Sequence, residues 1–144
     1  TIRLGEKDNS YYFKFFNNYP EIKVDNGLQI INNIIKKNRL IFFSYYSTGF
    51  LECLTKNIPT ICFDKEILNL LNDDSKEDFK KLFKKKIIYN DIIQISNFLN
   101  QNWDQIAQWW LSDEVQTTRK IFIQKYSRPG NYKTIKNIAK NLSL

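Results

Sequence analysis

The segment Arg39–Phe63, RLIFFSYYSTGFLECLTKNIPTICF, decides the fold. It begins with a continuous apolar run over Arg39–Phe43 and ends with a second one over Thr60–Phe63. Such runs are typical of strands that are buried on both faces of a parallel sheet. Between them lie a polar turn, Ser44–Gly49, and a short amphipathic stretch, Gly49–Thr55, which we expect to be a helix. Two strands joined by a helix predict a parallel βαβ unit.

The same alternation extends in both directions from this segment. Short apolar runs predict further strands at Ile2–Leu4, Glu21–Val24 and Ile87–Tyr89. Helical spacing of apolar residues predicts helices at Ser10–Asn18, Leu28–Lys37, Asp73–Lys86, Ile92–Leu99, Trp103–Leu111, Asp113–Tyr126 and Tyr132–Leu142. We therefore expect an α/β fold, a Rossmann-like parallel sheet flanked by helices, in one domain over 1–144 that is mostly helical over 91–144. The chain begins at Thr1, within an expected strand, so we expect it to be part of a larger protein.

Three tryptophans mark the C-terminal region. Trp103 and Trp110 fall on one helical stripe with Ile106, which predicts that both are buried in the core. Trp109 falls off this stripe, so we expect it to face another domain or a membrane surface. The charge-dense stretch Asp73–Lys86 predicts a solvated surface helix that turns Phe79, Leu82 and Phe83 inward, with a basic membrane-facing patch as the alternative.

Composition narrows the possible partners and chemistry. The net charge of +7 favours anionic partners such as nucleotide phosphates. The sequence has no histidine, which removes the commonest general base and the commonest metal ligand. Cys53 and Cys62 lie in apolar settings and are expected to be free buried thiols. No apolar run approaches the roughly 18 residues that span a membrane, which predicts a cytoplasmic location.

The turn Ser44–Gly49 is the candidate binding site. It follows a strand of the expected parallel sheet, and ligands of such sheets bind beyond the carboxyl ends of the strands. It also opens a helix, whose free N–H groups suit a diphosphate. Ser47 and Thr48 can add hydroxyl hydrogen bonds, Gly49 permits close approach of a ligand, and Glu52 can accept hydrogen bonds from ribose or sugar hydroxyls. The alternative is that a hydroxyl simply caps the helix and Glu52 is a favourable acid in its first turn.

The stretch Ser47–Ile61, STGFLECLTKNIPTI, resembles the donor-site segment of GT-B glycosyltransferases that build bacterial surface polysaccharides. The chain also resembles a family of O-antigen or surface-carbohydrate transferases. This likeness covers Arg3-Leu4, Pro20–Asp25 (PEIKVD), Asn57–Ile61 (NIPTI) and the W-D-x-I-x-x-W-W-x-S-x-E-V-Q-x-x-R block of Trp103–Arg119. Asp64-Lys65-Glu66 departs from the family pattern, in which a Trp and a longer acidic loop follow the strand.

The resemblance implies that the chain is the C-terminal, nucleotide-sugar-binding half of a GT-B enzyme. Arg3, Ser47, Thr48 and Gly49 would then lie on the donor phosphates and Glu52 on the ribose or the sugar. The partners would be a nucleotide-sugar and an N-terminal acceptor domain, which would supply the general base, and the catalytic residues stay unknown. The resemblance further implies that no metal and no cofactor is required. It also implies a cytoplasmic protein in peripheral contact with the inner face of the membrane.

Rival functions remain open from the sequence. The same fold serves sugar epimerases and polyol-phosphate polymerases, which the donor segment barely distinguishes from transferases. A basic domain that binds nucleic acid or an anionic membrane is the alternative of another class. Nucleic acid is the less favoured partner, because the lysines are dispersed and form no recognised nucleic-acid motif. A non-catalytic interaction domain with this fold is the last alternative.

Overall fold

The computed structural model describes residues 2–3, 14, 16, 18–25 and 38–127. The chain forms two compact units, Thr1–Asn38 and Arg39–Leu144. In the first unit, β1 (Ile2–Arg3) pairs in parallel with β2 (Val24–Asp25), with Arg3 beside Asp25. The strand expected at Ile2–Leu4 is confirmed over two residues, and the strand expected at Glu21–Val24 starts at its last residue. The helices expected near 10–18, 28–37 and 132–142 lie largely or wholly outside the described residues.

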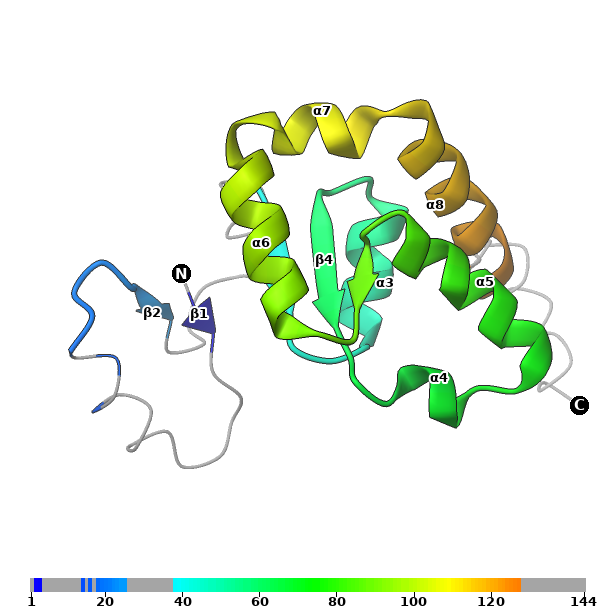
Figure 1. Ribbon diagram of the computed structural model, residues 1–144, viewed down its shortest axis with the longest axis horizontal. Helices are drawn as coiled ribbons and strands as arrows, with labels where there is room; N and C mark the ends of the chain where they lie inside the picture. The colour runs from blue at the N-terminus through cyan, green and yellow to red at the C-terminus, as the bar shows by residue number, and fades with distance from the viewer. Residues whose placement is uncertain (1, 4–13, 15, 17, 26–37, 128–144) are drawn as a thin grey trace, which may run out of the picture. The chain divides into compact units, whose positions relative to one another are not determined.

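A three-stranded parallel sheet forms the centre of the second unit. Its order is β3 (Ile41–Phe43), β4 (Thr60–Phe63), β5 (Ile88–Tyr89), and the register places Ile41 beside Thr60 and Cys62 beside Ile88. The helices are α3 (Thr48–Thr55), α4 (Ile67–Leu70), α5 (Asp73–Lys84), α6 (Ile92–Asn102), α7 (Ile106–Leu111) and α8 (Asp113–Tyr126), with a 3-10 turn η1 (Trp103–Gln105) between α6 and α7 (Figure 1). This arrangement confirms the α/β class with a Rossmann-like parallel sheet flanked by helices.

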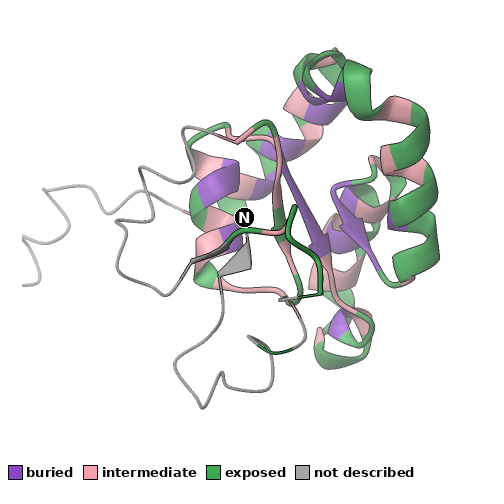
Figure 2. Ribbon diagram, turned by 90° about the vertical axis from the view of Figure 1, so that its left-hand side faces the viewer, coloured by how far each residue is buried: buried purple, intermediate pink, exposed green. Residues whose placement is uncertain are grey.

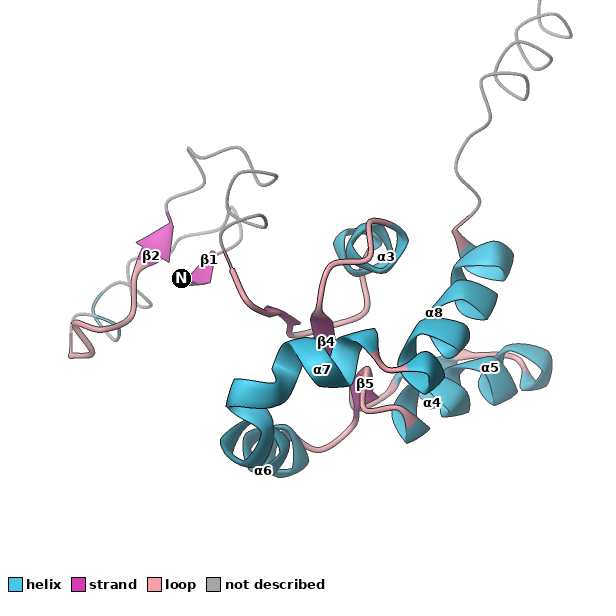
Figure 3. Ribbon diagram, turned by 90° about the horizontal axis from the view of Figure 1, so that it is seen from above, coloured by secondary structure: helices cyan, strands magenta, loops and turns pink. Residues whose placement is uncertain are grey.

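Helices cover both faces of this sheet. Figure 3 shows α3, α5 and α8 on one side of the strands and α6 on the other. Alternation along β4 explains the two layers, because Cys62 packs in the cluster with α3, α5 and α8, whereas Ile61 packs with Tyr89 and with Ile95 of α6. The buried strands stand out at the centre of Figure 2. Burial on both faces, expected for Arg39–Phe43, is wrong at Phe42, which is 47% exposed.

The charge-dense stretch forms α5 with the predicted inward face. Phe79 and Leu82 are fully buried, and Phe83 packs partly buried against the same cluster. On the outer face, three lysines pair with acidic residues three positions earlier: Lys76 with Asp73, Lys80 with Glu77 and Lys81 with Asp78. Such pairs are ordinary for a solvent-facing helix and each stabilises it only slightly.

Asp78 links α5 to α8 and gives the fold a testable pH dependence. Its carboxylate accepts hydrogen bonds from Lys125 Nζ (2.7 Å), Lys81 Nζ (3.1 Å) and Tyr126 Oη (3.0 Å). These donors, Lys125 first, lower the pKa of Asp78 to about 2.

The unfolded carboxyl group titrates near about 3.9, so the stabilisation by Asp78 is complete above that pH and is lost as the pH falls through the folded pKa. We expect the free energy of unfolding of the wild-type chain, measured with urea, to fall more steeply between about pH 4 and pH 2 than that of the Asp78→Asn variant. Parallel pH profiles would contradict this role.

The tryptophan stripe is only half confirmed. Trp110 and Ile106 are buried as predicted, but Trp103 is 48% exposed and the guanidinium of Arg39 lies over its ring. The prediction assumed one continuous α-helix from Trp103, whereas η1 changes the helical period over Trp103–Gln105 and turns the first tryptophan outward. The outward position expected for Trp109 is also wrong, because this side chain packs against the core and its Nε1 donates to Lys85 O (3.2 Å).

Candidate functional site

The carboxyl ends of the three parallel strands meet at one edge of the sheet, the lower edge in Figure 1. The turn Ser44–Ser47 follows β3 there, and Asp64 follows β4. Helix α3 starts at the same edge with Thr48, so its N-terminus lies at the place where ligands of parallel α/β sheets bind. The sequence predicted this placement of the turn and of the helix start.

Ser47 occupies the N-cap position of α3. Its backbone is extended (φ −147°, ψ 166°), its Oγ accepts a hydrogen bond from Phe50 N (3.4 Å), and its carbonyl oxygen accepts one from Leu51 N (3.2 Å). The capping role foreseen as an alternative is therefore present. These bonds leave the N–H groups of Thr48 and Gly49 without an acceptor inside the helix. The Ser47 hydroxyl proton also stays available for donation, because the cap uses only its oxygen.

Gly49 has a packing reason to be glycine. A Cβ atom at this position would lie 3.1 Å from Cε1 of Phe43 and 3.7 Å from Ser47 Oγ. The first turn of α3 thus packs directly on the aromatic side chain at the end of β3. Close approach of a ligand to Gly49 stays a prediction beside this structural role.

The predicted site includes two charged residues, Glu52 and Arg3, and the structure describes the side chain of Glu52 only. Glu52 lies on the exposed side of α3, where Oε2 pairs with Lys56 Nζ one turn later (3.3 Å). Arg3 lies in β1 of the first unit, and its side chain is outside the described part of the chain. The predicted contacts of both residues with a donor remain predictions.

Asp64 belongs to this edge and was not predicted. Its Oδ2 accepts from Tyr46 N (3.0 Å), its Oδ1 from Glu66 N (3.2 Å), and its own N–H donates to Tyr89 O (2.8 Å). The carboxylate thereby holds the turn after β3 against the turn after β4. Its position in the sequence could have indicated this role, because Asp64 comes directly after the strand predicted at Thr60–Phe63.

The family-like block NIPTI and the W-W block meet in one polar network. Asn57 has a left-handed backbone (φ 57°) just after α3, and its Oδ1 accepts from Trp110 Nε1 (3.0 Å) and from Gln116 Nε2 (3.0 Å). Its N–H donates to Leu54 O and that of Ile58 to Cys53 O, the pattern that closes a helix with a left-handed residue. These two blocks of the sequence therefore fix the C-terminal end of α3.

Arg119 completes this network. It is 5% exposed, its Nη1 donates to Leu54 O (2.6 Å), and its Nε and Nη2 reach Gln116 Oε1. Burial lowers the pKa of Arg119. Its positive charge lies at the C-terminal end of α3, where the helix dipole is negative, so it stabilises the helix whose other end opens on the sheet edge.

The described residues include no reactive thiol and no cluster of metal ligands. Cys53 and Cys62 are buried free thiols, as predicted, and burial raises their pKa values to about 11 and about 12. Both thiols are therefore unreactive at neutral pH. Across residues 2–3, 14, 16, 18–25 and 38–127, no group of acidic, histidine or cysteine side chains is arranged to hold a metal ion. No helix in these ranges has the length and apolar character needed to cross a bilayer.

Comparison with known proteins finds one family for this chain. A model described as "LIC12162 family transferase" matches residues 8–142, which is nearly the full chain. No curated protein and no solved structure matches.

Proposed function

Because the chain belongs to the LIC12162 family of transferases, we propose that it binds the nucleotide-sugar donor of a glycosyltransferase that acts in surface polysaccharide synthesis. The observation that carries the proposal is the position of α3. Its N-terminus lies at the carboxyl edge of a parallel sheet, with the N–H groups of Thr48 and Gly49 directed away from the helix body. A helix start in this position is suited to a diphosphate.

The side chains at this edge are of two kinds, hydroxyls that can donate hydrogen bonds and carboxylates that can only accept them. The hydroxyls of Ser47 and Thr48 can donate to phosphate oxygens, and the Ser47 cap does not prevent this. Carboxylates accept hydrogen bonds and repel phosphates, so Glu52 and Asp64 suit the hydroxyls of ribose or of the transferred sugar. We assign Ser47, Thr48 and Gly49 to the diphosphate and Glu52 to the sugar or ribose, and we keep Arg3 as a further phosphate ligand.

In the proposed reaction this chain stabilises the leaving group. The positive end of α3 and its free N–H groups would compensate the charge that develops on the leaving diphosphate. We assign no general base to this chain and expect it, with the acceptor, on a second domain. A GT-B arrangement and peripheral contact with a membrane surface are parts of the same proposal.

Nucleotide binding tests the proposal by thermal unfolding. The chain is heated with UDP, GDP, CDP or CMP, or with their sugar conjugates, and the midpoint temperature Tm is recorded. A nucleotide at 100 times its Kd stabilises the native state by about 2.7 kcal/mol, so one nucleotide is expected to raise Tm clearly. Glu52→Ala and the double variant Ser47→Ala/Thr48→Ala should reduce this shift.

The variant Ser47→Asp distinguishes the two roles of Ser47, capping helix α3 and binding phosphate. Aspartate is as good an N-cap as serine, so the variant should fold as well as the wild type, but its charge would repel a diphosphate. Asn72→Asp, the same type of change at the N-cap of α5, is the matched control. If Ser47→Asp keeps the full nucleotide shift, or if no nucleotide shifts the wild type, the donor site is not at α3.

A further inference from the structure

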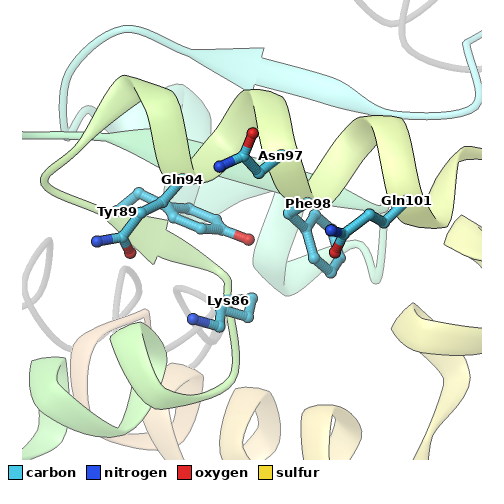
Figure 4. A pocket seen from close by; sticks show the side chains of 6 residues that line it. All are labelled: Lys86, Tyr89, Gln94, Asn97, Phe98 and Gln101. Atoms are coloured by element: carbon cyan, nitrogen blue, oxygen red, sulfur yellow. The ribbon is translucent and has the colours of Figure 1, made fainter.

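A pocket lies between β5 and α6, on the face of the sheet opposite α3. Its volume is about 260 Å³, and Figure 4 shows the six side chains that line it: Lys86, Tyr89, Gln94, Asn97, Phe98 and Gln101. Tyr89 ends β5, and its carbonyl oxygen accepts from Asp64 N at the carboxyl edge, but its side chain packs on the α6 face of the sheet, whereas α3 packs on the opposite face. The following inference is therefore independent of the proposed donor site.

The Tyr89 hydroxyl is the unusual group of this pocket. Tyr89 is 2% exposed, and its Oη is buried without a hydrogen-bond partner in the described part of the chain. In Figure 4 the ring lies across the pocket with its hydroxyl toward Phe98. Burial raises the pKa of Tyr89, so the hydroxyl stays protonated and is a donor. An unpaired buried hydroxyl destabilises a fold, and phenylalanine would fill the same space without that cost.

The pocket wall offers amides and one cation. Gln94, Asn97 and Gln101 follow one face of α6 at helical spacing and provide amide donors and acceptors together. Lys86 follows the C-cap of α5 and has a left-handed backbone (φ 63°), a conformation that usually selects glycine or asparagine. Its Nζ lies 5.9 Å from the centre of the Tyr89 ring. No carboxylate lines the pocket.

We propose that the pocket between β5 and α6 binds a single sugar ring that carries a carboxylate or phosphate group. Amides pair with sugar hydroxyls, because both groups donate and accept hydrogen bonds. Phe98 offers an apolar surface to the C–H face of the ring, and the Tyr89 hydroxyl donates to one ring substituent. Lys86 pairs with the anionic group. The volume is slightly below the usual range for ligand sites, roughly 300–1,000 Å³, and suits one ring rather than a nucleotide.

Binding is measured by NMR on the ¹⁵N-labelled chain. The probes are glucuronate and glucose 6-phosphate, with neutral glucose and inorganic phosphate as comparisons, each titrated to about 20 mM to cover weak binding. The expected result is saturable shifts of the side-chain amides of Gln94, Asn97 and Gln101 with an anionic sugar, and weaker binding of glucose and of phosphate alone.

Two variants locate the contacts. Tyr89→Phe should weaken binding of the sugar probes by roughly fivefold without lowering Tm, because it removes a donor that is unpaired in the free protein. Lys86→Asn keeps a residue that tolerates the left-handed backbone and should reduce the affinity for the anionic sugars to that for glucose. Tyr19→Phe and Lys84→Gln remove a hydroxyl and a positive charge at residues that do not line the pocket, and both should leave binding unchanged.

Three results would overturn the proposal. The first is that no anionic sugar shifts the three amides at the highest concentration. The second is binding that neither Tyr89→Phe nor Lys86→Asn weakens. The third is phosphate alone binding as tightly as glucose 6-phosphate, which would mean that the pocket does not recognise the sugar.

Discussion

Replacing Trp110 with alanine is expected to lower the free energy of unfolding by about 4 kcal/mol, within the range for large-to-small changes of buried aromatic residues. Trp110 is 1% exposed and lies in the core cluster with Phe50 and Leu54 of α3 and with Phe122 of α8. Alanine would leave a cavity between these helices and remove the donor to Asn57 (3.0 Å to Oδ1). Urea unfolding followed by circular dichroism measures the change.

Trp103 provides the matched control for Trp110. The two tryptophans fall on one stripe in the sequence, but Trp103 is 48% exposed, so Trp103→Ala should cost no more than about 1 kcal/mol. The guanidinium of Arg39 over its ring adds little at such an exposed place. Equal losses for the two variants would mean that the stripe is continuous and that the 3-10 turn is wrong.

The sequence predicted the elements near the candidate site well because their signals are local. The strand over Thr60–Phe63 has the expected bounds, and α3 begins one residue earlier than expected, at Thr48. A polar turn before this helix and Asn57 with Pro59 after it supply both ends within about ten residues. The exposure of Phe42 was not predictable in this way, because a continuous apolar run does not reveal which face of a strand lacks a cover.

The candidate site was predictable in position but not in its internal contacts. The placement of Ser47 at a helix start follows from strand order, whereas the steric limit at Gly49 depends on the ring position of Phe43. The link from Asp64 to Tyr46 N joins residues 18 positions apart, and that from Trp110 to Asn57 joins residues 53 apart. Hydrophobic periodicity carries no information on such pairs.

These contacts give a physical role to the residues of the NIPTI and W-W blocks. Asn57, Trp110, Gln116 and Arg119 bond to one another or to the last turn of α3, and none of them lies at the sheet edge. They orient the helix from its C-terminal end, opposite the end at which we propose that the donor binds. A pattern that looks functional in the sequence is therefore, at these four positions, a means of positioning α3.

Substitutions at Asn57 separate the parts of this positioning role. Asn57→Ala should cost about 2 kcal/mol, because alanine is strained in the left-handed conformation by about 1 kcal/mol, and Trp110 Nε1 and Gln116 Nε2 lose the Oδ1 acceptor although they keep Asn57 O and Trp110 O. Asn57→Gly removes the Oδ1 acceptor without the strain, so we expect a smaller loss of about 1 kcal/mol.

Asn57→Asp is the decisive variant. Asn57 Oδ1 accepts the hydrogen bonds from Trp110 Nε1 and Gln116 Nε2, and an aspartate oxygen can accept the same two bonds. Aspartate keeps that oxygen and also tolerates the left-handed backbone, so its stability should stay within about 0.5 kcal/mol of the wild type at neutral pH. The expected order from urea unfolding is wild type close to Asp, then Gly, then Ala. If Asp is as unstable as Ala, the acceptor geometry is wrong, and if Gly equals Ala, the backbone at residue 57 is not left-handed. Either result would remove the link between the two sequence blocks on which the orientation of α3 rests.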